Sequence, residues 1–411
     1  MAKEVSATLA QPHAINSRRK RIWRWVWLVL LGALALYGLY RWGWIPSYTE
    51  RLTFYGDSTK LKQSVIIPTL NCPVTTGKNI IWCASFQKAW DELNTSSIGK
   101  IQHPLTLVGA ETYSKRLNHE AMPPLTDLPS TSYAAAGIGP GIVPTIQSAM
   151  QARFPGVSLP AFGDYAPQDI LAYCYLEAVI KFPIPFFNAA PMRFAGKRVA
   201  CFGIRAEDSG DQYDLRSQVH VLYQDRHTFV IDPCYTSQIQ VVLACVTPGA
   251  TLADTIADTE RKITDLSNLK DENNKYVDLM KQPQLSEQEM AWLNHYIEYG
   301  NPSSNTALGP NDILLIPNMH WSIDHRFSEI AMKDFAPDRY YFLRNAQQTL
   351  DFSLNRSGVI LTSSAWAKAR IKCMPQYFIF DRPFLLYLRM RGHAHPFFAM
   401  WVNNTELLTK M

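Results

Sequence analysis

Residues 378 to 388 read Phe-Ile-Phe-Asp-Arg-Pro-Phe-Leu-Leu-Tyr-Leu. The alternation of apolar side chains in this stretch predicts a strand with one face in a core. The alternating positions include Phe378, Phe380, Leu385 and Tyr387. Pro383 fixes φ and lacks an N–H group, so regular pairing is expected to end there. Asp381 and Arg382 are neighbours that point to opposite faces of a strand, so they are not expected to form a simple pair. The stretch is therefore interpreted as structural.

The rest of the chain alternates between strand and helix patterns, which favours an α+β fold with strands and helices interspersed. Apolar runs rich in β-branched residues predict strands at 219–223, 228–231, 239–246, 313–316 and 377–387. Helical periodicity predicts helices at 80–93, 252–263 and 287–299. Segments rich in Pro, Gly and Ser at 123–144 and 300–310 are interpreted as long surface loops.

The stretch at 378–388 resembles the carboxy-terminal signature of serpins, the protease-trapping family. Three further passages are similar to serpin passages and follow the family's order. Phe229–Tyr235 resembles a Pro-Tyr turn between two strands, Leu315–His320 a sheet strand, and Leu350–Ser353 the Asp-Phe-Ser turn before the strand that leads into the reactive loop. Asn79–Trp82 is a fainter match to an early helix. The resemblance implies a serpin-like body over about residues 79 to 404, with a central mixed β-sheet and packed helices.

In serpins a long reactive loop, which carries the bait bond and inserts into the central sheet, lies just before the signature. Here only four residues, Met374 to Tyr377, separate Cys373 from Phe378. The resemblance also implies a polar cluster beneath the sheet that controls its opening, and its serine, asparagine and histidine align with Cys83, Glu177 and Ala367. The Gly-Lys-x-Trp passage of the family is replaced by Phe182-Pro183-Ile184-Pro185. Both departures favour a body that does not trap proteases.

The amino terminus predicts a membrane anchor. Residues 25 to 40 carry no charge, and the wider stretch 22–45 is broken only by Arg24 and Arg41. At 1.5 Å per residue these stretches span roughly 24 and 36 Å, which bracket a hydrocarbon core of about 30 Å. Tryptophan and tyrosine are concentrated at both ends, as in interfacial belts. A cleaved signal is the rival, because Ala33-Leu34-Ala35 has the small-x-small form of a cleavage site.

The distribution of charge predicts the orientation. Residues 1 to 50 hold seven Lys or Arg against two Glu, so this part carries the whole net charge of +5. The rest of the chain has no net charge. The basic run Arg18 to Arg21 is expected to stay in the cytoplasm, which places the body on the periplasmic or extracellular side. The neutral body has no electrostatic footprint for nucleic acid. Seven cysteines without a CxxC pair are interpreted as mostly buried free thiols.

Patterns that carry enzyme or metal chemistry are weak. There is no GxSxG, HExxH or Walker loop, and Gly137–Gly141 is interpreted as a flexible turn. His393 and His395 are a candidate metal pair without a third ligand cluster, and His320, Asp324 and His325 are a polar set without a nucleophile. We therefore expect no catalytic residue, no metal and no cofactor.

These observations divide the chain into a cytoplasmic tail at 1–21, a transmembrane signal-anchor helix at 22–45, a linker at 46–78 and a serpin-like domain at 79–411. The expected function is a membrane-anchored, non-inhibitory binding or structural module that is not an enzyme. Its expected partners are the membrane, through 22–45, and a protein. The alternative is a serine or cysteine protease inhibitor with a non-standard bait loop, such as 123–144.

Overall fold

The computed structural model describes most of the chain after residue 51. The described residues are 52–96, 104–119, 127–157, 159, 162–205, 213–225, 228–265, 284, 286, 290, 306–309, 311–336, 340–357 and 376–411. The chain divides into two compact units, 1–50 and 51–411, and every described residue belongs to the second. None of the described helices is long and apolar enough to span a bilayer. The basic tail and the predicted anchor at 22–45, like the helix predicted at 287–299, lie outside these residues.

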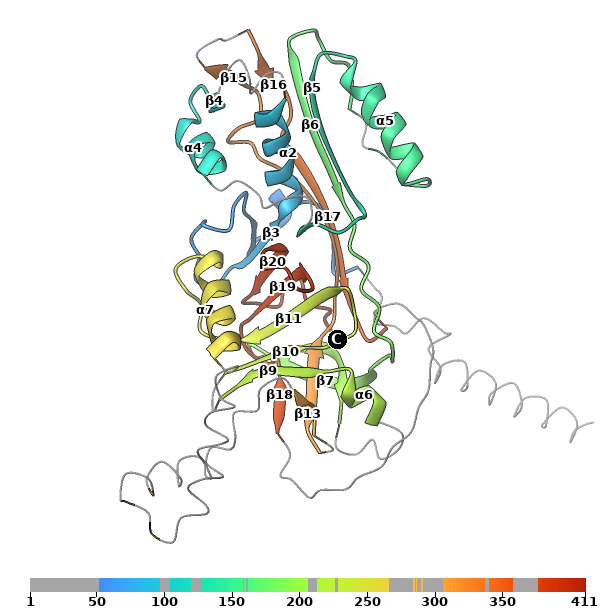
Figure 1. Ribbon diagram of the computed structural model, residues 1–411, viewed down its shortest axis with the longest axis vertical. Helices are drawn as coiled ribbons and strands as arrows, with labels where there is room; N and C mark the ends of the chain where they lie inside the picture. The colour runs from blue at the N-terminus through green and yellow to red at the C-terminus, as the bar shows by residue number, and fades with distance from the viewer. Residues whose placement is uncertain are drawn as a thin grey trace, which may run out of the picture. The chain divides into compact units, whose positions relative to one another are not determined.

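The fold contains short helices and many strands (Figure 1). The helices are η2 (Ser58–Lys60), α2 (Ala84–Thr95), α4 (Glu111–His119), α5 (Ile142–Arg153), α6 (Tyr213–Ser217) and α7 (Leu252–Asp265). The helix predicted at 252–263 is confirmed as α7. Its start follows from the sequence, because the Thr251 hydroxyl accepts a hydrogen bond from Asp254 N–H (3.0 Å) and the Asp254 carboxylate accepts one from Thr251 N–H (3.1 Å). This reciprocal pair caps the helix.

The largest sheet has eight strands in the order β12-β9-β10-β11-β19-β20-β3-β2. Its strands are β2 (Ser64–Ile66), β3 (Asn79–Cys83), β9 (His220–Gln224), β10 (Phe229–Asp232), β11 (Ile239–Cys245), β12 (Thr306–Ala307), β19 (Phe384–Met390) and β20 (Pro396–Val402). All seven residues of β11 and of β20 are buried. The expected strands at 219–223, 228–231 and 239–246 are therefore confirmed, with small shifts at their ends.

The signature stretch forms two strands rather than one. β18 (Tyr377–Ile379) pairs parallel with β13 (Ile313–Pro317), whereas β19 lies between β11 and β20 in the large sheet. The break falls before Pro383, as expected for a residue without an N–H group. Phe384 to Tyr387 have no exposed surface, so the buried strand predicted from this stretch is confirmed.

The remaining strands form three smaller sheets, ordered β1-β14-β17, β18-β13-β8-β7 and β4-β15-β16-β6-β5. Their other members are β1 (Phe54–Asp57), β4 (Thr106–Leu107), β5 (Ser132–Ile138), β6 (Asp169–Leu176), β7 (Phe187–Phe194), β8 (Lys197–Ile204), β14 (Met319–Arg326), β15 (Lys333–Ala336), β16 (Phe342–Leu343) and β17 (Gln347–Leu354). Parallel and antiparallel pairs occur together, so the expected α+β class with mixed sheets is confirmed. Besides the large sheet, these three smaller sheets make up the rest of the β-structure in the described part of the chain.

The core lies between the large sheet and the sheets that contain β17 and β7. Phe352 of β17 stacks on Phe398 of β20 at 4.9 Å, and Phe194 of β7 meets the edge of Phe384 of β19 at 6.1 Å. The helix expected at 80–93 begins only at Ala84, because the apolar run before it is β3, a fully buried strand paired with β2 and β20. Local periodicity cannot separate a buried strand from a buried helix over so few residues.

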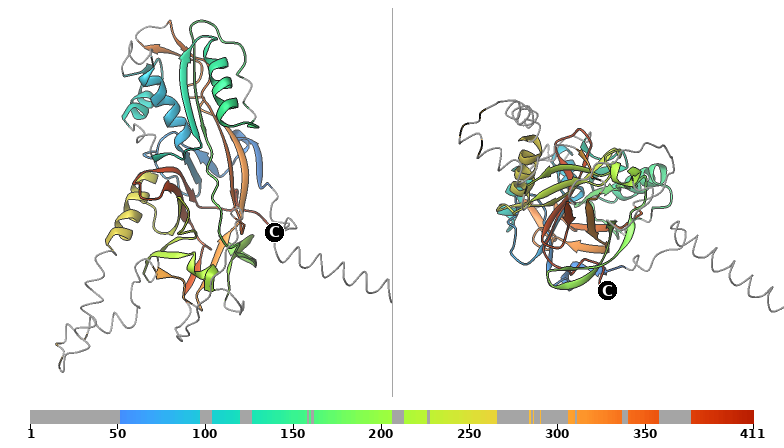
Figure 2. Two further views of the ribbon diagram at one scale, coloured as in Figure 1. Left: turned by 45° about the vertical axis from the view of Figure 1, so that its right-hand side comes forward. Right: turned by 90° about the horizontal axis from the view of Figure 1, so that it is seen from below.

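Helices cover both faces of the antiparallel pair β5–β6, whose connection contains α5 (Figure 2). Leu171 of β6 belongs to a small core with Ile146 and Met150 of α5, whereas Ile170 belongs to the main core beside Trp90 of α2. Consecutive strand residues point to opposite faces, so the two helices pack on opposite sides of the pair. The loop predicted at 123–144 is therefore wrong at 132–138 and at 142–144, where β5 and the start of α5 lie.

Candidate functional site

The Asp351-Phe352-Ser353 passage lies inside β17, not in a turn before a strand. β17 pairs antiparallel with β14 over its whole length, with Leu354 opposite Met319 and Gln347 opposite Arg326. The turn expected here is therefore wrong, because the passage is part of an eight-residue ladder. The chain that joins β17 to the signature strand β18 is then residues 355–376 rather than the four residues 374–377. The expectation that no room exists for a loop is wrong, because it counted from Cys373.

The start of this connection is fixed to the body. The Arg356 guanidinium donates to the Phe186 carbonyl (2.7 Å), and Phe186 N–H donates to the Arg356 carbonyl (2.9 Å). Phe186 lies in the core, and its ring meets the edge of Phe182 at 5.0 Å. Phe182 thus forms a packed aromatic contact near the place where the resemblance implied a tryptophan. Residues 358–375 lie outside the described part of the chain.

A buried polar cluster lies where β17 crosses the start of α2. The Gln348 side chain, 5% exposed, donates from Nε2 to the Cys83 carbonyl (3.2 Å) and to Ser85 Oγ (2.7 Å). Ser85 Oγ lies 3.5 Å from Cys83 Sγ. Gln348 Oε1 of β17 and Gln87 Oε1 of α2 are both buried and have no hydrogen-bond partner among the described residues. The cluster joins the junction of β3 and α2 to β17, which lies far away in sequence.

The sequence alignment identified only one member of this cluster correctly. Cys83 is buried as expected, but Glu177 is exposed just after β6, where its N–H donates to the Thr131 carbonyl (3.1 Å). Ala367 lies outside the described residues. Gln348 takes the position beside Cys83. Burial is the main cause that raises the pKa of the Cys174 thiol on β6, and electrostatic repulsion from Cys83 raises that pKa further.

This cluster contains no group that titrates near neutral pH. Burial raises the pKa of both thiols, so Cys83 and Cys174 stay protonated, and a carboxamide does not ionise. The six cysteines of the described residues are free and five of them are buried, as expected. The cluster can therefore hold the strand and helix together through hydrogen bonds, and nucleophilic chemistry is not favoured there.

His393 and His395 lie together, but on a partner that the sequence analysis did not connect with them. Each Nδ1 atom lies 2.8 Å from a different oxygen of the Asp127 carboxylate. The histidines come from the turn after β19, and Asp127 precedes β5. No group of three or more His, Cys, Asp or Glu side chains suited to a metal ion occurs in the described part of the chain. The pair therefore connects two segments instead of presenting an open metal site.

The polar set on β14 is divided between the two faces of its strand. The Asp324 carboxylate accepts a hydrogen bond from Thr349 (2.7 Å), while His325 Nδ1 lies 2.8 Å from Ser58 Oγ and its ring meets the edge of Phe327. Burial lowers the pKa of His325. Because these two side chains face apart, no shared site is formed.

Two further candidates are also structural. Gly137 is the last but one residue of β5, and a Cβ atom there would lie 2.9 Å from Ile142 Cδ1, so glycine permits the close turn into α5. The strand that the sequence analysis found missing before this glycine run is therefore present. Asp381 and Arg382 do form an ion pair, but only at 3.9 Å and with both side chains about half exposed. Such a pair contributes little to stability.

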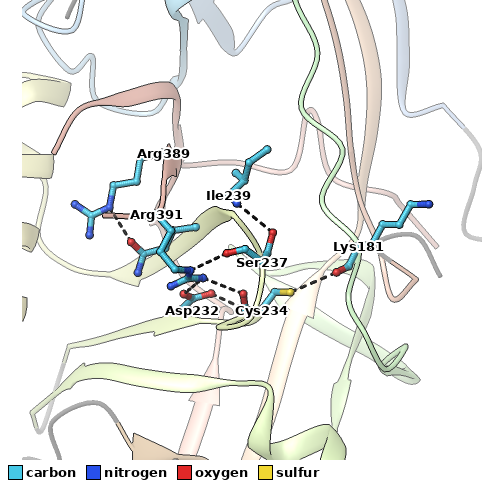
Figure 3. A network of polar contacts seen from close by, with 8 residues as sticks. Lys181, Asp232, Cys234, Ser237, Ile239, Arg389 and Arg391 are labelled. Atoms are coloured by element: carbon cyan, nitrogen blue, oxygen red, sulfur yellow. Dashed lines mark hydrogen bonds and ion pairs between the residues drawn. The ribbon is translucent and has the colours of Figure 1, made fainter. Parts of the chain in front are cut away.

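A further polar network surrounds Asp232 and was not anticipated (Figure 3). The Arg391 guanidinium donates to Asp232 Oδ2 (2.9 Å), the Cys234 carbonyl (3.0 Å) and the Ser237 carbonyl (2.7 Å). Asp232 Oδ1 accepts from Cys234 N–H (3.0 Å), and the Cys234 thiol donates to the Lys181 carbonyl (3.3 Å). The network ties the turn between β10 and β11 to the end of β19 and to the chain after β6.

Burial raises the pKa of the Asp232 carboxyl, and the Arg391 charge opposes that rise. The Asp232 side chain has no exposed surface, so its charge depends on the Arg391 cation and on hydrogen bonds from Cys234 N–H and the Gln240 side chain. Arg391 also lies over the Tyr235 ring at 5.2 Å, and that ring stacks on His220 at 3.7 Å. The passage that resembles the Pro-Tyr turn of serpins is thus anchored from the signature side of the fold.

Comparison with known proteins returns solved structures only. No family model and no curated protein matches the chain. Among the solved structures are thyroxine-binding globulin with thyroxine (12% identity, 80% of this chain and 93% of that one, TM-score 0.36) and native protease nexin-1 with heparin (10%, 80% and 92%, 0.39). A third is the mouse protein Z-dependent protease inhibitor (11%, 79% and 91%, 0.41).

These three structures are serpins, the family to which the signature pointed. The described part of the chain is a serpin-like α+β body. At this level of identity and TM-score the likeness carries no argument about ligand, target or mechanism.

Proposed function

We propose that this protein is a serpin-like binding or structural module, anchored in a membrane through residues 22–45, that does not trap proteases. Its amino terminus lies in the cytoplasm and its body on the periplasmic or extracellular side, where it meets a protein partner. The observation that carries the non-inhibitory part is the Cys83–Ser85–Gln348 cluster. The membrane part is supported by the uncharged run at 25–40 and by the basic residues before it.

The cluster supports a body that stays closed. In the family that the chain resembles, polar side chains beneath the sheet control its opening. Here Gln348 holds β17 to the start of α2 through two hydrogen bonds, and α2 also packs against the β5–β6 pair. A separation of β17 from α2 would leave buried polar groups unpaired, at a cost of about 1–3 kcal/mol for each group. A neutral cluster of thiols and an amide also lacks a proton switch.

Protease inhibition is the second candidate, and one observation favours it. Residues 355–376 are enough to form a strand as long as the eight-residue β17 and to leave further chain for a bait bond. In the described part of the chain β17 pairs only with β14, and β6 pairs along one edge with β5 and on the other edge only at Asp169 and Ile170. The alternative bait at 123–144 is not favoured, because β5 and the start of α5 occupy 132–138 and 142–144.

One experiment separates the two candidates. The full chain in detergent is incubated with a panel of serine and cysteine proteases and analysed on denaturing gels, with mass spectrometry to locate each cut and any adduct. We expect cuts within 355–376, no covalent adduct and no large rise in melting temperature after cleavage. A variant with Lys368→Ala, Arg370→Ala and Lys372→Ala, which removes the three basic cleavage sites between Ser357 and Tyr377, identifies trypsin-like cuts. A covalent protease adduct at any bond of the chain would establish the second candidate instead.

A further inference from the structure

The two ends of the described body meet beside one hairpin. Thr53 Oγ1 lies 3.5 Å from Thr409 Oγ1, and the Thr409 carbonyl accepts a hydrogen bond from Ala200 N–H of β8 (2.8 Å). Lys410 forms an isolated bridge with Val199, which directly precedes Ala200 in the same strand. The point at which the chain enters the body, the carboxyl terminus and the β7–β8 hairpin therefore form one region.

The tip of this hairpin is basic. Arg193 lies directly opposite Arg198, and Phe194 lies opposite Lys197. Directly opposite residues of an antiparallel pair project on the same face, so the two arginines lie side by side, an arrangement of like charges that is unfavourable in isolation. The side chains of Arg193, Lys197 and Arg198 are exposed, and none of these side chains forms an ion pair or hydrogen bond within the described part of the chain.

No neighbouring acid along the chain compensates these charges, because no Asp or Glu occurs between Glu177 and Glu207. Two large apolar side chains lie at the same region, at the two ends of the described chain: Leu52 is 48% exposed and Met411 is 73% exposed. Basic residues around exposed apolar ones are the composition of surfaces that contact the membrane interface.

Chain length places this region near the bilayer if the anchor is correct. Only residues 46–51 separate the predicted end of the span, Ile45, from Leu52. A fully extended chain covers at most about 3.3–3.6 Å per residue, so Leu52 stays within roughly 20–25 Å of the membrane boundary. Surface charges act over a Debye length of about 8 Å at physiological salt. A modest approach of the body toward the membrane therefore brings the hairpin within reach of the headgroup charges.

We propose that this region, the basal surface formed by Leu52, Arg193, Lys197, Arg198, Lys410 and Met411, docks on anionic phospholipid headgroups. The inference rests on the membrane anchor of the proposed function, and it adds the face that the body turns to the bilayer and the lipid chemistry that it selects. The paired guanidinium groups of Arg193 and Arg198 suit phosphate oxygens, which accept hydrogen bonds in a forked geometry. The exposed ends Leu52 and Met411 add apolar contact at headgroup depth.

The test compares lipid charge with the whole protein in nanodiscs. Full-length chain is placed in discs of neutral phosphatidylcholine or of phosphatidylcholine with phosphatidylglycerol at about a third of the lipid, and hydrogen exchange is measured at the 193–200 hairpin. Each basic side chain near an anionic surface contributes about fivefold to docking. We therefore expect exchange at the hairpin turn to slow by at least about fivefold in the anionic discs, and the slowing to weaken as salt is added.

A variant with Arg193→Glu and Arg198→Glu is expected to exchange at the neutral-disc rate in both lipids. The matched control carries Lys115→Glu and Lys181→Glu, which make the same charge change at two exposed lysines outside the hairpin and the basal surface, and it should keep the slowing. Equal exchange of the wild-type chain in the two lipids, or unchanged slowing in the arginine variant, would overturn the basal surface and favour a protein on this face. Failure of the chain to enter discs at all would overturn the anchor as well.

Discussion

Replacing Arg391 by methionine is expected to destabilise the body by about 3 kcal/mol at neutral pH. Methionine keeps much of the aliphatic stem but removes three donated hydrogen bonds, to Asp232, Cys234 and Ser237. Asp232 has no exposed surface, and a buried charge left without its partner costs about 3–5 kcal/mol. The lower end applies because the Arg391 side chain keeps 28% of its surface exposed, so water partly screens the pair.

The size of this loss should depend on pH in a defined direction. Burial already raises the pKa of Asp232, and removing the Arg391 charge raises it further. A carboxyl whose folded pKa lies above its unfolded value of about 3.9 binds more protons in the folded state, so its contribution falls as pH rises. The variant should therefore be closest to wild type near pH 4 and furthest from it near pH 7.

Denaturant unfolding of the full chain in detergent, followed by tryptophan fluorescence, measures both effects. A double-mutant cycle with Asp232→Asn should show that the two changes together cost clearly less than their sum, because the asparagine no longer leaves a buried charge. Arg382→Met is the control, since the exposed Asp381–Arg382 pair should contribute less than about 1 kcal/mol. The reasoning is refuted if Arg391→Met costs no more than Arg382→Met, or if the cycle is additive.

Three further outcomes are expected. A chain that ends at Tyr377 loses β19 and β20, which leaves the apolar edges of β11 and β3 in water, and should be insoluble; a soluble product with an unchanged melting transition would contradict the fold assignment. Burial lowers the pKa of His325, so the unfolded state binds the proton more readily and stability should fall as pH drops below about 6.5. A His325→Asn variant should lose that part of the pH dependence in thermal melts, and an identical slope in wild type and variant would exclude this residue as its source. Protease added outside spheroplasts should digest the body and spare a tag at Met1, whereas a protected body would reverse the predicted topology.

Much of the fold could be anticipated where side-chain pattern is local. The α7 helix followed from its periodicity and its Thr251–Asp254 cap, and the β11 and β19 strands followed from continuous apolar runs. Errors arose where different structures share one local pattern. The run at Asn79–Cys83 suits a buried helix as well as a buried strand, and Gly137–Gly141 marks a turn without revealing the strand before it.

The candidate site could be predicted only in part, for the same reason. Cys83 was identified through the family resemblance, but Gln348 carries no chemical signature, and its partner lies 265 residues away. The prediction of a turn at Asp351–Ser353 implied that the next strand begins after this passage, whereas the passage lies inside the strand that contains Gln348. The connection to β18 was therefore predicted to be shorter than it is. Pairing with β14 places the passage in a strand, and the alternation of Leu350, Phe352 and Leu354 with polar residues was a local signal for one.

The sequence by itself determined the α+β class, the buried signature strand with its break before Pro383, and the charge asymmetry that predicts a membrane anchor. Only the tertiary structure decided which distant groups meet: Arg391 with Asp232 across 159 residues, and Asp127 with His393 and His395. The physical reason is that periodicity and capping act within a few residues, whereas buried polar groups and strand edges are satisfied by whichever partner the packed core brings near.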